Sequence, residues 1–195
     1  MKFVFVFAFA SLVLLVPATA QDKPRFNNIV HQLFLDDQKD RGEGAEQLPW
    51  DKIAARDLER RSQVHKLLES DALKTAEDFH DAAFIYQHGQ TSDDYLLAHV
   101  VATVAVAKGD ASSLWVSAAS VDRYLQSINR PQIFGTQYNS SNNSPTTQEP
   151  YETKLVPDQL RAVLCVPSLE QQQRNIAEFN AGRYPDTMVP KGCSR

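Results

Sequence analysis

His99 is the residue whose setting in the sequence most suggests chemistry. It lies within a predicted helix, Tyr95 to Lys108, that is otherwise almost entirely apolar. A buried imidazole must find a hydrogen-bonding partner. If the turns flanking this helix are centred near residues 90 and 110, antiparallel packing places Asp122 level with His99 on one side, and His80 or Asp81 on the other. We therefore expect a polar layer of these side chains across three helices.

Such a layer has three interpretations, and the sequence leaves all three open. Asp122 could orient His99 in a satisfied core network that fixes the register of the helices. The same pair could be an acid–base site of a hydrolase-like enzyme, in which His99 transfers the proton and Asp122 orients the ring. The third interpretation is a metal site, but the chain has neither His-Glu-x-x-His nor Cys-x-x-Cys spacing. We assign no metal and no cofactor.

A second set of residues could bind a ligand instead. It combines a histidine at a predicted helix end, an arginine beside Asp122 and a short loop segment, and its members are His88, Arg123, Gln132, Gly135, Thr136 and Gln137. The guanidinium of Arg123 could clamp an anion or tie down a loop carbonyl. The loop amides and hydroxyl could likewise hydrogen-bond a ligand or hydrogen-bond buried backbone groups. Gly135 permits a tight bend.

These residues must be positioned by a central unit of three antiparallel helices, at about residues 75–129. Thr75 with Asp78 predicts a capping box at its start, and Thr91 or Ser92 caps the next helix. The all-round apolar character of residues 95–108 predicts that this helix lies in the middle of the domain. Pro131 prevents continuation of the last helix. The sequence therefore predicts an all-α fold, a single compact multi-helix domain with its core at residues 51–138.

The flanking segments complete this domain. Apolar spacing predicts a further helix at about residues 24–37, and the polar run at 139–150 predicts an exposed loop without a sheet. Pro157 and Ser168 mark the starts of two short C-terminal helices within 157–195. Cys165 and Cys193 form an even pair near the end of the chain, which favours a disulfide in an exported protein.

The N-terminus predicts export. Lys2, an apolar run from Phe3 to Val16 and the small residues at 18–20 follow the order of a cleavable signal peptide at 1–20. No second run is long enough to span a bilayer, so we expect no membrane span in the mature chain, residues 21–195. Loss of Lys2 changes the formal net charge from −4 to −5. An acidic chain without a basic stripe is not expected to bind nucleic acid.

Residues 83–137 resemble a bacterial family of uncharacterised helical domains. The resemblance lies in Tyr-Gln-His at 86–88, Ala-His at 98–99, Ala-Lys-Gly at 107–109, Asp-Arg-Tyr-Leu-Gln at 122–126 and Pro-Gln-Ile-Phe-Gly-Thr-Gln at 131–137. It implies an all-helical bacterial domain, frequently exported, and no activity that can be transferred. If that family has a functional site, the positions that match its motif here are His88, His99, Asp122, Arg123, Gln132, Gly135, Thr136 and Gln137.

Our leading functional hypothesis is a periplasmic or extracellular binding module, with a small molecule or an envelope protein as its partner. Its pocket would be walled by the three central helices and covered by the loop from Gln132 to Tyr138. The alternative is the hydrolase-like enzyme using His99 and Asp122. A purely structural envelope protein is the third class, and it predicts no change of melting temperature with any ligand.

Overall fold

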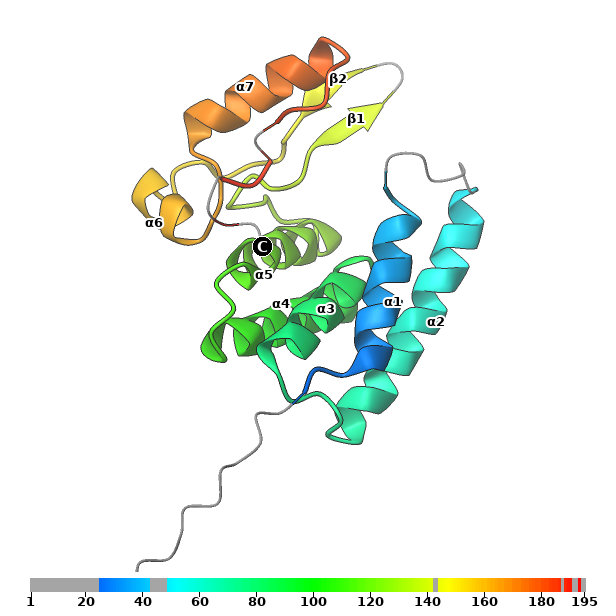
Figure 1. Cartoon of the computed structure of the whole chain (residues 1–195). Helices are drawn as coiled ribbons and strands as arrows, with labels where there is room; N and C mark the ends of the chain where they lie inside the picture. The colour runs from blue at the N-terminus through cyan, green and yellow to red at the C-terminus, as the bar shows by residue number, and fades with distance from the viewer. Residues whose placement is uncertain (1–24, 43–48, 142–143, 187, 191–192, 194–195) are drawn as a thin grey trace, which may run out of the picture.

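In the part of the chain that the structure describes, five helices form the N-terminal part, and a hairpin with two more helices forms the C-terminal part (Figure 1). The computed structural model describes residues 25–42, 49–141, 144–186, 188–190 and 193. The expected signal peptide at 1–20 lies outside them. The elements are α1 (Asn28–Lys39), α2 (Trp50–Glu69), α3 (Ala76–Gln87), α4 (Ser92–Ala107), α5 (Ser113–Ser127), β1 (Asn139–Ser141), β2 (Ser144–Thr147), α6 (Asp158–Val163) and α7 (Leu169–Asn180). The predicted all-α fold class is confirmed.

Both predicted helix starts in the central unit are capped by a reciprocal pair of hydrogen bonds. The Thr75 hydroxyl accepts from the backbone N–H of Asp78 at 3.1 Å, and the Asp78 carboxylate accepts from the Thr75 N–H at 2.8 Å. Thr91 and Asp94 repeat the arrangement at the start of α4. Asp78 also accepts from the N–H of Asn27 at 2.6 Å, which ties the beginning of α1 to the beginning of α3.

We expect Thr75→Ala to lower the free energy of unfolding by about 1 kcal/mol, because the N–H of Asp78 loses its side-chain acceptor. Thr75→Ser keeps the hydroxyl and should remain close to the wild type. Urea denaturation followed by circular dichroism measures both. Equal losses in the two variants would show that the methyl group, not the cap, matters at this position.

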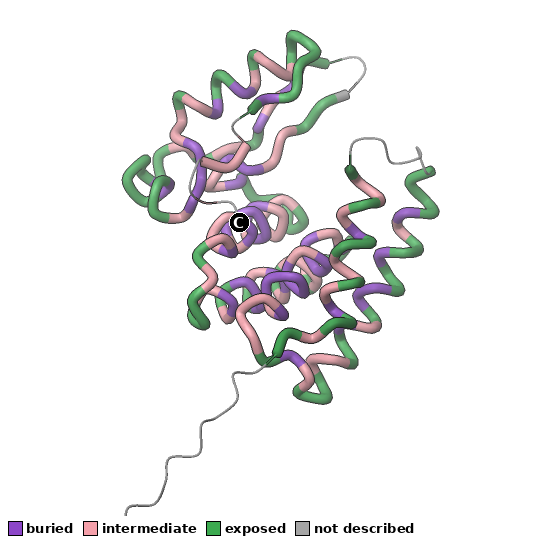
Figure 2. Tube along the Cα trace, in the orientation of Figure 1, coloured by how far each residue is buried: buried purple, intermediate pink, exposed green. Residues whose placement is uncertain are grey.

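The core of the helical part is centred on α3, which packs against α1, α2, α4 and α5. Its buried apolar residues are Ala82, Ala83, Ile85 and Tyr86. Figure 2 shows buried residues, in purple, concentrated in the region where α3, α4 and α5 pack together. The prediction that the helix at 95–108 occupies the middle of the domain is wrong. It packs on α3 and α5 with one face and leaves Leu96 and Val100 exposed on the other.

The C-terminal part differs from the sequence prediction in one respect. Within the expected loop at 139–150, β1 and β2 form an antiparallel hairpin in which Asn139 pairs with Thr147. The hairpin lacks the alternating apolar pattern of a sheet because α7 supports it through polar contacts, the Asn180 side chain accepting from the N–H of Thr146 at 2.7 Å. The predicted disulfide between Cys165 and Cys193 is present.

Among the helices of the described ranges, none combines the length and the apolar character that crossing a bilayer requires.

Candidate functional site

The structure does not bring His99 to Asp122. The Nδ1 atom of His99 lies 3.0 Å from the hydroxyl and 3.1 Å from the carbonyl oxygen of Ser117, on α5. Asp122 lies on the same helix but is fully buried, and its carboxylate accepts four hydrogen bonds from the loop at 133–136. The predicted polar layer is therefore wrong, and with it the geometry that the acid–base pair required.

The four loop residues singled out in the sequence hold the loop to itself and to its neighbours. The Gln132 side chain accepts from the N–H of Gln137 at 3.0 Å and donates to the carbonyl of the same residue at 2.9 Å. The Thr136 hydroxyl donates to Asp122 at 2.8 Å. Gly135, at φ +76°, leaves no room for a side chain beside Gln172. These side chains therefore make hydrogen bonds within the protein.

Four of the five histidines lie beside a carboxylate, and His99 is the exception within the described ranges. The pairs are His31 with Asp81, His65 with Glu69, His80 with Asp110 and His88 with Asp37. His99 was singled out in the sequence because its helix is apolar. In the structure, however, His99 contacts a hydroxyl and a backbone carbonyl rather than an acidic group.

His80, Asp110 and Ser113 have the residue types of a catalytic triad but not its geometry. One ring nitrogen, Nδ1, approaches both Oδ2 of Asp110 and Oγ of Ser113, each at 2.9 Å. A triad needs the carboxylate and the hydroxyl on opposite ring nitrogens. Asp110 also accepts from the N–H of Ser112 at 3.1 Å, just before α5 begins. The group therefore anchors the turn between α4 and α5.

His88 and Asp37 form the pair that best fits an acid–base or orienting role. Nδ1 of His88 lies 2.9 Å and 3.1 Å from the two oxygens of Asp37, whose side chain is 1% exposed. The other ring nitrogen, Nε2, makes no hydrogen bond within the described part of the chain. A carboxylate that holds one nitrogen and leaves the second available is the arrangement that general acid–base catalysis uses.

An ionic cluster around Asp37 joins the C-terminal end of α1 to the middle of α2. Arg41 donates to Asp37 at 2.8 Å and also to Asp57. Arg60 donates to Asp57 at 3.0 Å and pairs with Asp40. Burial acts to raise the pKa of Asp40, but the hydrogen bond and charge of Arg60 outweigh it and hold that pKa below its ordinary value. The cluster fixes the position of Arg41 and, through Asp37, that of His88.

Arg123 faces this cluster from α5 without a carboxylate of its own. Burial lowers the pKa of Arg123, the Tyr95 hydroxyl opposes that shift through a hydrogen bond, and the positive charge of Arg41 adds to it. Tyr95 in turn donates to the carbonyl of Gly89 at 2.9 Å. No acidic side chain in the described ranges pairs with Arg123. Arg41 is itself paired with Asp37 and Asp57, so of these two arginines it is Arg123 that has no carboxylate partner in the described ranges.

Two hydrogen-bond donors at and near Arg123 have no acceptor in the described part of the chain. Nε of Arg123 and Nε2 of Gln126 are buried atoms without a hydrogen-bond partner among the described residues. The two residues are three positions apart on α5, so their side chains lie on one face of that helix. We define the Arg123 site as Arg123, Gln126, Tyr95 and Arg41. Its surplus of donors and positive charge suits a carboxylate or phosphate group.

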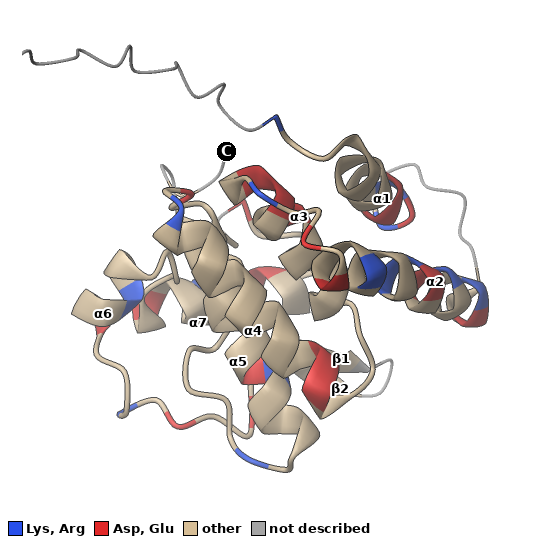
Figure 3. Ribbon diagram, turned by 90° about the horizontal axis from the view of Figure 1, so that it is seen from below, with Lys and Arg blue, Asp and Glu red and all other residues tan. Residues whose placement is uncertain are grey.

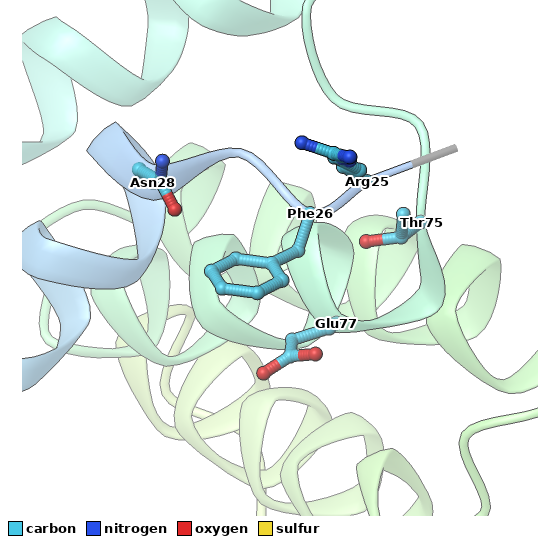
Figure 4. Close-up of a pocket in the computed structure, with 5 residues that line it drawn as sticks. All are labelled: Arg25, Phe26, Asn28, Thr75 and Glu77. Atoms are coloured by element: carbon cyan, nitrogen blue, oxygen red, sulfur yellow. The ribbon is translucent and has the colours of Figure 1, made fainter. Parts of the chain in front are cut away.

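Two recesses on the helical part are weaker candidates for a functional site. One, of about 390 Å³, lies at the start of α1, where the Phe26 ring lies between Arg25 and Glu77 (Figure 4). The other, of about 530 Å³, is a groove between α2 and the α3–α4 turn. In it the Tyr86 hydroxyl lies 3.4 Å from His65, and burial, aided by Asp94, raises the pKa of Tyr86 to about 12. That phenol stays protonated at neutral pH.

The structure gathers the predicted site residues in two places: His88 and Arg123 lie in one region, and Asp122 meets Thr136 in the loop that also contains Gln132, Gly135 and Gln137. Asp37, Arg41, Tyr95 and Gln126 were missed. The spacing of Asp37 and Arg41, four apart in one helix, was a usable signal for an ion pair. In the described ranges no group of three or more histidine, cysteine or acidic side chains is arranged to hold a metal ion.

Fold and site define a mostly helical protein with a small C-terminal hairpin and a candidate site on α4 and α5, at Tyr95, Arg123 and Gln126. No family model matches the chain, and neither a curated protein nor a solved structure does. The resemblance to a bacterial family of uncharacterised helical domains remains a prediction.

Proposed function

We propose that the protein is an exported binding module that recognises the anionic group of a small molecule or of an envelope protein at the Arg123 site. The observation that carries the proposal is a partly buried guanidinium whose Nε atom is buried without a hydrogen-bond partner, and which has no carboxylate partner in the described part of the chain. Burying an unpaired charge costs several kcal/mol. A carboxylate or phosphate oxygen seated between Arg123 and Gln126 would satisfy both unpartnered donors and offset the repulsion from Arg41.

The proposal predicts that Arg123→Gln weakens ligand binding without weakening the fold. The probes are inorganic phosphate, acetate and citrate, tested by thermal shift and by isothermal titration. A probe at about one hundred times its Kd should stabilise the wild type by about 2.7 kcal/mol. Arg123→Gln should bind that probe at least about tenfold more weakly, because the charge-assisted hydrogen bonds are gone.

The melting temperature of Arg123→Gln without a ligand is a second test. Because the cost of burying the unpaired charge disappears, Arg123→Gln should melt at or above the wild-type temperature. Arg174→Gln removes an arginine that is exposed and paired with Glu170, and it controls for the change of net charge. If no probe binds the wild type, or if Arg123→Gln unfolds more readily than Arg174→Gln, the arginine is a structural tie and the proposal is wrong.

A second candidate function rests on the contact between His88 and Asp37. In a hydrolase-like enzyme, Asp37 would orient the ring, Nε2 of His88 would transfer the proton, and the Arg123 site would hold the anionic part of the substrate. p-Nitrophenyl acetate and p-nitrophenyl phosphate are suitable test substrates. His88→Gln should abolish turnover and leave probe binding intact, whereas a binding module shows no turnover in either protein.

A further inference from the structure

The outward face of α4 has the pattern of a helix-pairing seam. Its exposed positions are Asp93, Leu96, Val100, Thr103 and Ala107, which are spaced by three, four, three and four residues. This is the spacing of the core positions of a coiled coil. No charged residue occurs on α4 between Asp94 and Lys108, and Figure 3 shows the middle turns of α4 in tan.

Nothing in the described part of the chain covers this seam. Leu96 is 44% and Val100 49% exposed, whereas Ala98, Val101 and Ala102 on the opposite face are buried against α3 and α5. The hydroxyl of Thr103 donates to the carbonyl of His99 at 2.9 Å. That bond satisfies the hydroxyl within the helix, so Thr103 can pack against a partner without leaving a donor unsatisfied.

The seam is nearly symmetric about Val100, which identifies the partner it fits. In an antiparallel pair of α4 helices related by a two-fold axis, Val100 meets its own copy and Leu96 faces the partner's Thr103. The same register places Asp93, at the N-terminal end, beside the partner's Lys108, at the C-terminal end. Each copy thus forms one opposite-charge contact at each end of the seam, and the antiparallel helix dipoles also attract.

We propose that a second copy of this chain docks on α4 in this antiparallel register. A seam of four helical turns is about 21 Å long. The area it buries is below the roughly 1,600 Å² of a standard stable interface, so the dimer should be reversible, with a Kd of micromolar order. The seam lies on the face of α4 opposite the bundle core and is independent of the Arg123 site.

Sedimentation velocity of the chain from Gln21 onward, the expected mature form, tests the proposal over about 1 to 500 μM. The wild type should shift from monomer to dimer across that range. Val100→Glu brings two like charges together on the two-fold axis and should leave only monomer. Val163→Glu is the matched control, since Val163 on α6 is 68% exposed and lies outside the seam. A wild type that stays monomeric, or a Val100→Glu protein that still dimerises, would overturn the proposal.

Charge reversal tests the register. Asp93→Lys and Lys108→Asp should each weaken dimerisation by about tenfold, because each replaces two attractive contacts by two repulsive ones. The double variant restores both contacts and should dimerise close to wild type. Circular dichroism checks that the helices remain formed. A double variant that is weaker than either single variant would show that the two residues do not meet, and the antiparallel pairing would be wrong.

Discussion

Asp122→Ala should lower the free energy of unfolding by about 4 kcal/mol or more, a large part of the stability of an ordinary domain. The carboxylate accepts from the N–H groups of Ile133, Phe134 and Thr136 at 2.8, 2.9 and 2.9 Å, and from the Thr136 hydroxyl at 2.8 Å. Each buried donor left without an acceptor costs about 1–3 kcal/mol. The loss should exceed that of an ordinary surface change several times over.

The measurement is urea denaturation, with Asp186→Ala as the control. Asp186 is an exposed aspartate of the C-terminal part, and its removal should change stability by less than about 0.5 kcal/mol. If Asp122→Ala behaved like Asp186→Ala, the four hydrogen bonds would contribute little. The loop at 133–136 would then be held by its other contacts, among them the fully buried Arg161, which donates to the carbonyls of Ile133 and Phe134.

The helices could be predicted because their signals are local. The capping pair Thr75 and Asp78 lies within one turn, and hydrophobic spacing of three and four residues reports one helix at a time. The same holds for the start of α7 at Ser168, whose hydroxyl accepts from the N–H of Gln171 at 3.2 Å. Each of these features needs only neighbouring residues to form.

The contacts between helices could not be predicted to the accuracy that a site requires. Assuming a turn centred near residue 110 placed His99 level with residue 121, whereas the contact is with Ser117. The α4–α5 connection, residues 108–112, is centred on residue 110 as assumed, so the difference of four residues, about one helical turn, comes from how the two helices pack. Asp122 then meets the loop that follows its own helix. A shift of this size is enough to separate a proposed catalytic pair.

The prediction that α4 lies in the middle of the domain was wrong for a related reason. An apolar helix predicts burial, but burial requires partners on every side. Here α3 takes the central place, because α1 and α2 pack against it from one side while α4 and α5 pack from the other. The apolar outer face of α4 is then available to another molecule, which is the basis of the proposed dimer.

Gly135→Ala should be the second strongly destabilising change, with a loss of about 3 kcal/mol. A Cβ atom at this position would lie 2.2 Å from Oε1 of Gln172 and 2.5 Å from the hydroxyl of Tyr151. Those two atoms hydrogen-bond to each other at 2.9 Å, so neither can move without breaking the contact. Overpacking of this kind typically costs 1–3 kcal/mol, and a positive φ adds about 1 kcal/mol for alanine.

Gly182→Ala separates the cost of the steric clash from the cost of the positive φ. Gly182 has nearly the same φ as Gly135, +74° against +76°. No described atom, however, lies within 4 Å of the position that an alanine methyl group would occupy there. Gly182→Ala should therefore lose only the backbone part, about 1 kcal/mol. Urea midpoints of the two variants give the difference. Equal losses would mean that the loop yields to the methyl group and that the packing of Gly135 against Gln172 is loose. A larger loss at Gly135 would show that only glycine allows the loop to pass between Asp122 and α7.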